Sequence, residues 1–338
     1  MKKRALAIAA IAAAALLMTG CSGGSGDSGS TGDGGDQANG DSGSSALEVT
    51  TLNMGVVPVA DAALAYIALD EGYFAEEGLE VKMEAMQNAA AIVPGVLNGQ
   101  VQIGQGAVPP IVSAASQSLP LVIVGNAANV PQDADADPMA ILVKAGSDIR
   151  SPKDLEGEIV AVNALQAAIE LIVSQAIESD GGDPSTVTYV AMPFPDMAAA
   201  VERGDVAAAG VIEPFRATGF EAGLVSISNP MTEGFDAGVS HAVYFASKEF
   251  AEKSPNTLAA YDRAIQRAAE AATADPALVR AVLVKYGNLP EPVAEMINLP
   301  AYDGSQVAAG SIETFIEIME AHGFIDAGSV KASDLLVG

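Results

Sequence analysis

The sequence predicts an α/β protein of two lobes, in which helices flank mostly parallel sheets and a helical tail ends the chain. Strand-like and helix-like segments alternate along the chain in two successive series. The part that follows the second series is nearly all helical in pattern. The composition agrees with this fold class, because 50% hydrophobic and 17% charged residues in a chain of 338 supply a large core.

The first series has the order βαβαβαβ, which is typical of a parallel sheet covered by helices. Its clearest member is the segment 79–86, where apolar and polar residues alternate with the period of a half-buried strand. Strands are expected at residues 52–57, 79–86, 101–103 and 121–124, and helices at residues 62–69, 89–97 and 109–116.

The second series repeats this alternation and is followed by one further strand and the helical tail. Its strands are expected at 139–143, 159–162, 187–191 and 206–212, and its helices at 164–178, 196–203 and 213–222. The further strand is expected at 239–246, and the tail helices at 255–273, 276–286 and 306–322.

We expect this tail to return to the first unit. Residues 48–135 and 240–338 would then form lobe 1, and residues 136–239 would form lobe 2. The two segments that join the lobes leave a crevice at the carboxyl ends of the strands. Ligands of open α/β sheets bind at such a place.

The amino-terminal residues are predicted to be an export signal rather than part of the fold. Lys2, Lys3 and Arg4 precede an uninterrupted apolar run over residues 5–18. A membrane-spanning helix needs about 20 apolar residues. The shorter run behind a basic start is therefore typical of a secretory signal peptide, here residues 1–20.

Cys21 directly follows this signal, in the segment LMTGC at residues 17–21, which resembles a bacterial lipobox. The resemblance implies that Cys21 carries a diacylglycerol thioether and becomes the first mature residue. A plain signal peptide followed by a chance Cys is the alternative. Ser, Gly and Asp dominate the next residues, so we expect a tether over residues 21–47. The protein is thus expected to be extracytoplasmic, anchored by a lipid to the outer face of the cell membrane.

The composition argues against nucleic-acid binding, metal binding and catalysis. With 16 Lys and Arg against 43 Asp and Glu, the formal charge is −27, which leaves few cations for a phosphate-binding face. One Cys excludes a disulfide scaffold and a thiolate zinc site, and His241 and His322 are too few for a His-rich metal site. The EF-hand-like start at Asp133 fails because Pro138 replaces the required glycine. The chain also has no hydrolase G-x-S-x-G motif, so we expect no enzyme activity, no cofactor and no metal.

Several short motifs occur in a fixed order along the two series. They are GYFAEEGLEV at 72–81, VLNGQVQIG at 96–104, SPKDLEG at 151–157, PFPDM at 193–197 and EPF at 213–215. Their order and spacing resemble the solute-binding proteins of ABC importers, in particular the group for sulfonates, taurine, nitrate and thiamine pyrimidine precursors. The resemblance implies the type 2 periplasmic-binding-protein fold, with two crossings between the lobes. It also implies closure on one small molecule and delivery to the transmembrane permease subunits, and we expect a monomer.

The loops that follow the predicted strands supply the candidate ligand-binding residues, because helix N-termini there present unpaired backbone N–H groups. The candidates are Pro58, Asp61, Gln105, Gly106, Ala107, Asn163, Gln166, Phe194, Glu213, Phe215 and Arg216. Gly106 belongs to an expected loop over residues 104–108, where glycine would let the backbone approach a ligand. Asn163 could instead cap the next helix. Phe194 and Phe215 could be packing anchors, and Arg216 could lie on a solvated helix face.

The distribution of cations bears on the charge of the ligand. Arg216 is the one basic residue that directly adjoins a predicted crevice loop, which disfavours a dianion such as phosphate. We therefore expect a sulfonate-, taurine- or nitrate-like monoanion, held by helix N-termini and Arg216. A thiamine pyrimidine precursor or another small heteroaromatic is the alternative, since a neutral or amine-bearing ligand could use Asp61 or Glu213. A lipid-anchored ligand sensor on the same fold is a further alternative.

Overall fold

The structure is a computed structural model that describes residues 46–287 and 289–336. The predicted signal peptide, Cys21 and nearly all of the predicted tether lie outside the described residues. Among the helices within the described ranges, none is long and apolar enough to cross a membrane.

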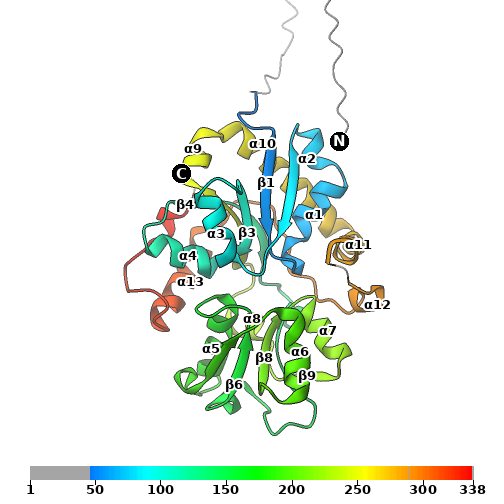
Figure 1. The fold of residues 1–338 in the computed structure, drawn as a ribbon, viewed down its shortest axis with the longest axis vertical. Coiled ribbons are helices and arrows are strands. Elements are labelled where there is room, and N and C mark those ends of the chain that lie inside the picture. Colours follow the sequence, from blue (N-terminus) through cyan, green and yellow to red (C-terminus); the bar gives the residue numbers. More distant parts are fainter. Residues whose placement is uncertain (1–45, 288, 337–338) are drawn as a thin grey trace, which may run out of the picture. The chain divides into compact units, whose positions relative to one another are not determined.

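Two five-stranded sheets form the framework (Figure 1). The first sheet, which defines lobe 1, has the order β2-β1-β3-β10-β4. Its strands are β1 (Thr51–Val56), β2 (Glu80–Ala85), β3 (Ile103–Ala107), β4 (Leu121–Asn129) and β10 (Ser240–Ser247). The second sheet, which defines lobe 2, has the order β7-β6-β8-β5-β9. Its strands are β5 (Met139–Lys144), β6 (Ile159–Val162), β7 (Thr188–Ala191), β8 (Ala208–Ile212) and β9 (Leu224–Ser226).

Each sheet is mostly parallel, with one antiparallel strand in the fourth place. In lobe 1, β1 pairs in parallel with β2 and β3, whereas β10 runs antiparallel to β3 and β4. In lobe 2, β6 pairs in parallel with β7 and β8, whereas β5 runs antiparallel to β8 and β9. The antiparallel strands are the ones that the chain forms directly after each crossing between lobes. The expected two-lobed fold with two crossings is confirmed.

Helices cover the faces of both sheets. Those of lobe 1 are the 3-10 helix η1 (Ala60–Ala62), α1 (Ala63–Asp70), α2 (Tyr73–Glu76), α3 (Ala89–Leu97) and α4 (Val108–Ser116). Those that follow the first crossing are η2 (Ala134–Ala136), η3 (Pro152–Leu155), α5 (Ala168–Ser179), η4 (Pro184–Thr186), α6 (Phe194–Arg203), α7 (Phe215–Glu221) and α8 (Pro230–Gly234). The tail consists of α9 (Lys248–Lys253), α10 (Pro255–Ala274), α11 (Pro276–Gly287), α12 (Glu291–Ala294), α13 (Ala309–Ala321) and η5 (Ala332–Asp334).

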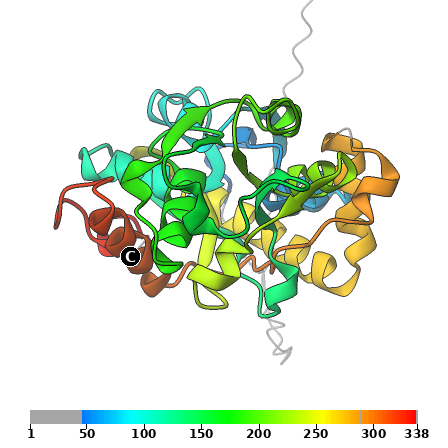
Figure 2. The same ribbon diagram turned by 90° about the horizontal axis from the view of Figure 1, so that it is seen from below.

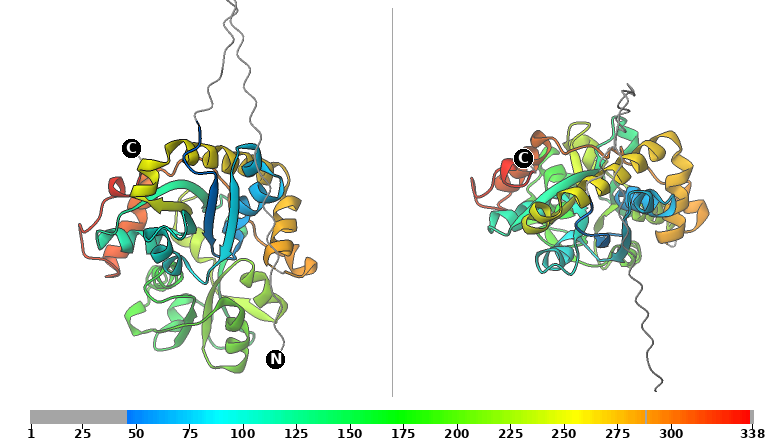
Figure 3. Two further views of the ribbon diagram at one scale, coloured as in Figure 1. Left: turned by 45° about the horizontal axis from the view of Figure 1, so that its top comes forward. Right: turned by 90° about the horizontal axis from the view of Figure 1, so that it is seen from above.

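The tail covers lobe 1 and also reaches lobe 2. Helices α10 and α11 pack on α1, and α10 lies across the end of lobe 1 in the left panel of Figure 3. Residues Ala301 and Leu336 bridge to β4 and cover that edge of the first sheet. Beyond this, α12 contacts α7 and α13 contacts α5, so the tail touches lobe 2 on two sides, as Figure 2 shows in orange and red.

Two of the expected element boundaries that bear on the site were wrong. The strand expected at 101–103 instead begins at Ile103 and runs to Ala107, so most of the expected crevice loop 104–108 is strand β3. A Cβ on Gly104 would lie 2.4 Å from the Phe245 ring, and one on Gly106 would lie 2.4 Å from Ala89 Cβ. These glycines therefore allow close packing of β3 against α3 and β10, rather than a ligand loop.

The helix expected at 164–178 begins later, at Ala168. Gln166 has a φ of 50°, a left-handed conformation that a helix cannot include. Residues 163–167 thus form an irregular segment between β6 and α5. Because it follows the carboxyl end of β6, this segment lies at the boundary between the lobes.

Candidate functional site

A pocket of about 60 Å³ lies between the lobes, at the carboxyl ends of the parallel strands. Lobe 1 contributes the segment after β1, the start of α3, strand β3, and His241 of β10. Lobe 2 contributes Asn163, the start of α5, Phe194 of α6 and Ile212 of β8. Met139, at the amino end of β5, Met231, in α8, and Phe315, in the tail helix α13, also line the pocket. Both lobes are needed to form it.

Asp61 and His241 form a buried pair on the lobe 1 side of this pocket. The Asp61 Oδ1 atom lies 3.3 Å from His241 Nε2, and both side chains are almost fully buried. His241 Nδ1 has no hydrogen-bond partner among the described residues. If the neutral ring donates its Nε2–H to Asp61, Nδ1 is an acceptor that is open to a ligand.

Gln105 presents a donor from the same side. Its Oε1 atom accepts a hydrogen bond of 3.2 Å from the Val57 N–H, which sets the orientation of the amide. Its Nε2 atom is buried and has no partner within the described ranges. A ligand acceptor is therefore the natural partner of this NH₂ group.

Asn163 presents an acceptor from lobe 2, because its buried Oδ1 atom also lacks a partner in the described part of the chain. Leaving a buried polar atom unpaired costs about 1–3 kcal/mol, so native structures rarely keep such atoms without a use. Three such atoms, on Gln105, His241 and Asn163, belong to residues that line this one pocket. Their gathering indicates a binding site for a polar small molecule.

The charge of the lining is set by Asp61. Among the described residues, no Lys or Arg lines the pocket, and Asp61 is the only Asp or Glu that does. Helix α5 offers some compensating polarity, because its N-cap residue Ala167 has no side chain to pair the first-turn N–H groups. Asn88, by contrast, caps α3 itself, since its Oδ1 accepts the Ala91 N–H at 2.9 Å.

The remaining walls are largely apolar. Ile169 and Ile172 of α5, Met139 and Phe315 of α13 are among the residues that surround the polar groups. Phe194 lines the pocket and stacks on Phe215 behind it, with ring centroids 5.0 Å apart. A ligand with a flat or apolar body would bury its surface against these walls.

Some of the expected site residues line the pocket and others do not. The structure places Asp61, Gln105, Gly106, Ala107, Asn163 and Phe194 in its lining. It does not place Pro58, Gln166, Glu213, Phe215 or Arg216 there. Gln166 is exposed, because its left-handed backbone lies ahead of α5. Asn88 and His241 also line the pocket but were not predicted from the sequence as site residues. A helix-cap pattern marks Asn88, but no local pattern marks His241, which reaches the pocket on the antiparallel strand.

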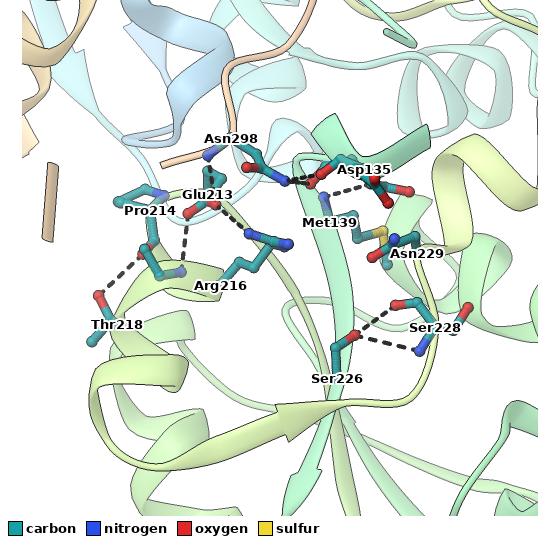
Figure 4. A network of polar contacts seen from close by, with 12 residues as sticks. Asp135, Met139, Glu213, Pro214, Arg216, Thr218, Ser226, Ser228, Asn229 and Asn298 are labelled. Atoms are coloured by element: carbon teal, nitrogen blue, oxygen red, sulfur yellow. Dashed lines mark hydrogen bonds and ion pairs between the residues drawn. The ribbon is translucent and has the colours of Figure 1, made fainter. Parts of the chain in front are cut away.

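Arg216 is paired within the protein instead of facing the pocket. Its Nη1 atom lies 3.2 Å from Glu213 Oε1 (Figure 4). Its guanidinium lies 4.7 Å from the centroid of the Phe220 ring. Glu213 is fully buried, and this burial raises the pKa of its carboxyl to about 7, although Arg216 and two backbone N–H groups oppose the shift. The expectation that Arg216 serves as a ligand cation is not supported by this placement.

The two connections between the lobes are held together by a buried carboxylate. Asp137, in the first connection, accepts hydrogen bonds from the N–H groups of Met139, Met231 and Thr232. Because Met231 and Thr232 belong to α8, near the second connection, the carboxylate joins the two crossings. Burial raises the pKa of Asp137, and these hydrogen bonds partly offset the shift. In the described part of the chain, no group of three or more His, Cys, Asp and Glu side chains is placed to hold a metal ion.

A family model described as NMT1/THI5 like matches residues 60–278. The chain belongs to the NMT1/THI5-like family. The match runs from the pocket residues of lobe 1 through lobe 2 and into the tail. It confirms the expected resemblance.

Two relatives of this NMT1/THI5-like protein are binding proteins for small solutes. The formylaminopyrimidine-binding protein of Halalkalibacterium halodurans is 27% identical over 226 residues, which is 66% of each chain. The taurine-binding periplasmic protein of Escherichia coli is 28% identical over 232 residues, 68% of this chain and 70% of that protein. The chain thus spans about two thirds of the length of these relatives. They are binding proteins, as expected for a chain with no enzyme motif.

Solved structures share the fold of this NMT1/THI5-like protein at low identity. The alkanesulfonate-binding protein SsuA of Xanthomonas axonopodis pv. citri, bound to MOPS, matches with a TM-score of 0.73 and 16% identity, over 86% of this chain and 99% of that one. The ligand-binding component of an ABC-type import system from Staphylococcus aureus matches with a TM-score of 0.74 and 10% identity, over 86% and 97%. These matches establish the two-lobed periplasmic-binding-protein architecture.

Proposed function

We propose that this NMT1/THI5-like protein is the extracytoplasmic solute-binding component of an ABC importer, which captures a small molecule between its lobes and delivers it to the permease subunits. The observation that carries the proposal is the pocket formed by both lobes, with unpaired buried polar atoms on Gln105, His241 and Asn163. The lipobox-like segment at Cys21 supports a lipid anchor that keeps the protein beside its transporter.

We infer that the ligand is a small, amine-bearing heteroaromatic molecule rather than a simple monoanion. The polar lining offers acceptors on Asp61, His241 and Asn163 and a donor on Gln105. Amino groups would donate to the acceptors, and a ring nitrogen or carbonyl would accept from the Gln105 amide. The apolar walls suit a flat ring. The relative from H. halodurans, which is named for formylaminopyrimidine, agrees with this chemistry.

A zwitterion such as taurine is the second candidate, and one feature of the pocket favours it. The start of α5 has first-turn N–H groups that no side chain caps, which suits sulfonate oxygens. The taurine ammonium would then pair with the Asp61 carboxylate on the opposite lobe. Nitrate and unsubstituted alkanesulfonates have no cationic group for Asp61, so we expect them to bind more weakly than either candidate.

Ligand capture would couple binding to closure of the lobes. A ligand that docks on Asp61, His241 and Gln105 in lobe 1 would gain the contacts with Asn163 and α5 only when lobe 2 approaches. A ligand favours the closed arrangement only to the extent that it binds that arrangement more tightly than the open one. The contacts with lobe 2 would supply this difference in affinity. The permease would then recognise the closed protein.

A thermal-shift and calorimetric screen tests these proposals. The ligands are formylaminopyrimidine, 4-aminopyrimidine, taurine, methanesulfonate and nitrate. We expect formylaminopyrimidine to raise the melting temperature most, since a ligand at 100 times its Kd adds about 2.7 kcal/mol to the free energy of unfolding. Binding of methanesulfonate and nitrate in preference to the aminopyrimidines would overturn the ligand class. If none of the five compounds binds, the proposal that the ligand is an aminopyrimidine or a sulfonate-like solute is wrong.

A further inference from the structure

Asp61 and His241 meet at the pocket wall from two segments that are each fixed by other contacts. The Tyr302 hydroxyl donates to the carbonyl of Ala60, the residue before Asp61, at 2.9 Å. His241 lies on β10, which is paired with β3 on one side and with β4 on the other. Because both residues belong to lobe 1, a movement of one lobe against the other does not pull the pair apart.

The Asp61 carboxylate determines which ring nitrogen of His241 carries a hydrogen. An ionised carboxylate only accepts hydrogen bonds, so the 3.3 Å contact of its Oδ1 atom with Nε2 needs a hydrogen on that ring atom. In the neutral ring, Nδ1 then carries a lone pair and no hydrogen. A further proton binds at Nδ1, whatever the pH at which the ring titrates.

The Nδ1 atom of His241 is also the ring atom that lacks a partner. It is buried, and no described residue forms a hydrogen bond with it. The His241 side chain lines the pocket, so a molecule in the pocket can supply the missing partner. An unpaired buried polar atom costs about 1–3 kcal/mol, and a ligand N–H would remove this cost. A proton and a ligand N–H therefore need the same lone pair.

We propose that Asp61 is a positioning residue for His241, which it holds with Nδ1 as the acceptor for a ligand N–H, so that a proton on Nδ1 excludes the ligand. The proposal deepens the proposed function and rests on it, because it requires an amine-bearing ligand. It adds regulation by pH to the same site. Histidine ordinarily changes its charge between pH 5 and 8, so the protein loses affinity for its ligand as the medium becomes acidic.

Few other titratable groups face this ring. In the described part of the chain, Asp61 and His241 are the only titratable residues of the pocket lining. Strands β3 and β4 and helices α3 and α4 contact β10 and contain no titratable residue. The hydroxyls of Tyr244 and Tyr302 lie near Asp61, and burial raises the pKa of both, so they stay protonated.

Helices α9 and α13 also contact β10, and both carry charged residues. Helix α9 follows the carboxyl end of β10, whereas His241 lies near its amino end. The charged residues of α9 are Lys248, Glu249, Glu252 and Lys253. The carboxylates of α13, all outside the pocket lining, are Glu313, Glu317 and Glu320. Among the described residues, Asp61 is thus the charged group that bonds the ring.

Competition for one lone pair fixes the direction of the pH effect. A bound ligand N–H stabilises the neutral ring, so the ligand should lower the pH at which His241 titrates. At 100 times its Kd, a ligand that binds only the neutral ring lowers this pH by about 2 units. By linkage, the affinity for the ligand falls about tenfold for each pH unit below the titration of the free ring.

Nitrogen NMR of the full chain, isotope-labelled in the histidine rings, tests the proposal. The chain has two histidines, and His322→Gln assigns the signals by removing the other ring. Without ligand, and at a pH above its titration, His241 should carry its hydrogen on Nε2 alone. Formylaminopyrimidine at 100 times its Kd should move the titration about 2 pH units lower. Asp61→Ala should allow both tautomers, whereas Asp148→Ala, at an exposed position of lobe 2, should keep one.

A hydrogen on Nδ1 of the neutral, ligand-free ring would overturn the proposal, and so would a single tautomer in Asp61→Ala. A ligand that leaves the titration of His241 unchanged would also overturn it. The same holds for a ligand that raises the titration, since the ring would then donate to the ligand as an imidazolium.

The ligand-free measurement separates this proposal from the proposed ligand class. If no amine-bearing compound binds, that ligand class is wrong, and the tautomers of the wild type and of Asp61→Ala still decide the role of Asp61. If Asp61→Ala does not fold, the wild-type tautomer and its ligand-induced shift decide alone.

Discussion

Asp61 Oδ1 lies 3.3 Å from His241 Nε2, although the two residues are 180 positions apart in the chain. Asp61 belongs to η1, directly after β1, and His241 lies near the amino end of β10. Because β10 inserts antiparallel between β3 and β4, its amino end reaches the edge where the parallel strands end. This pairing uses His241 Nε2 and leaves Nδ1 without a partner among the described residues, and it places a carboxyl group in the lobe 1 wall of the pocket.

Asp61→Asn should weaken binding of an amine-bearing ligand while the fold persists. The substitution removes the negative charge but keeps an oxygen that can accept from His241 Nε2. A hydrogen bond to a charged group contributes about 1.5–3 kcal/mol, so we expect about a 10- to 100-fold rise in the Kd measured by calorimetry. Asp148→Asn, at an exposed position of lobe 2, is the control. An unchanged Kd in Asp61→Asn would remove this carboxylate from the site.

Asn163→Ala should weaken binding by about 1–3 kcal/mol, because it removes the acceptor that lobe 2 presents to the ligand. The matched control is Gln166→Ala, three positions further along the same segment but exposed and outside the pocket lining. Calorimetry of both variants with formylaminopyrimidine checks the prediction. Equal affinities in the two variants would show that lobe 2 binds the ligand without this amide.

Gly106→Ala should destabilise the fold, because the new Cβ would lie 2.4 Å from Ala89 Cβ at the contact between β3 and α3. Overpacking of this kind costs about 1–3 kcal/mol, read as a lower free energy of unfolding in urea. Gly310→Ala in α13 is the control, since a Cβ at that position would have no neighbouring atom within 4 Å. Wild-type stability in Gly106→Ala would mean that α3 can move away from the sheet without cost.

The pKa of Glu213 also predicts a pH dependence of global stability. A carboxyl with a folded pKa of about 7 and an ordinary unfolded pKa near 4.3 favours folding below the unfolded value, and this contribution is lost as the pH rises through 7. We expect the wild type to lose about 3 kcal/mol relative to Glu213→Gln between pH 4.5 and pH 8. Parallel stability profiles of the two proteins in urea would contradict the raised pKa.

Local patterns in the sequence predicted most elements of the fold, because hydrophobic period and turn residues are short-range properties. The strand at 159–162 and the helix at 89–97 match β6 and α3. Where the predictions were wrong, contacts between segments that are far apart in the sequence determine the local secondary structure. Gly104 and Gly106 read as a loop by composition but lie in β3, since Phe245 and Ala89 occupy the space beside them.

The sequence by itself determined the two α/β lobes, the family and six of the pocket-lining residues, since all of these depend on patterns within short segments. Only the tertiary structure decided which side chains share the pocket and what charge they carry. His241 reaches the pocket on the antiparallel strand β10 of lobe 1, which the chain forms after its second crossing, whereas Arg216 is paired with the buried Glu213 outside the pocket lining. The physical reason is that strand order and long-range pairing place these groups, and neither leaves a mark in the neighbouring sequence.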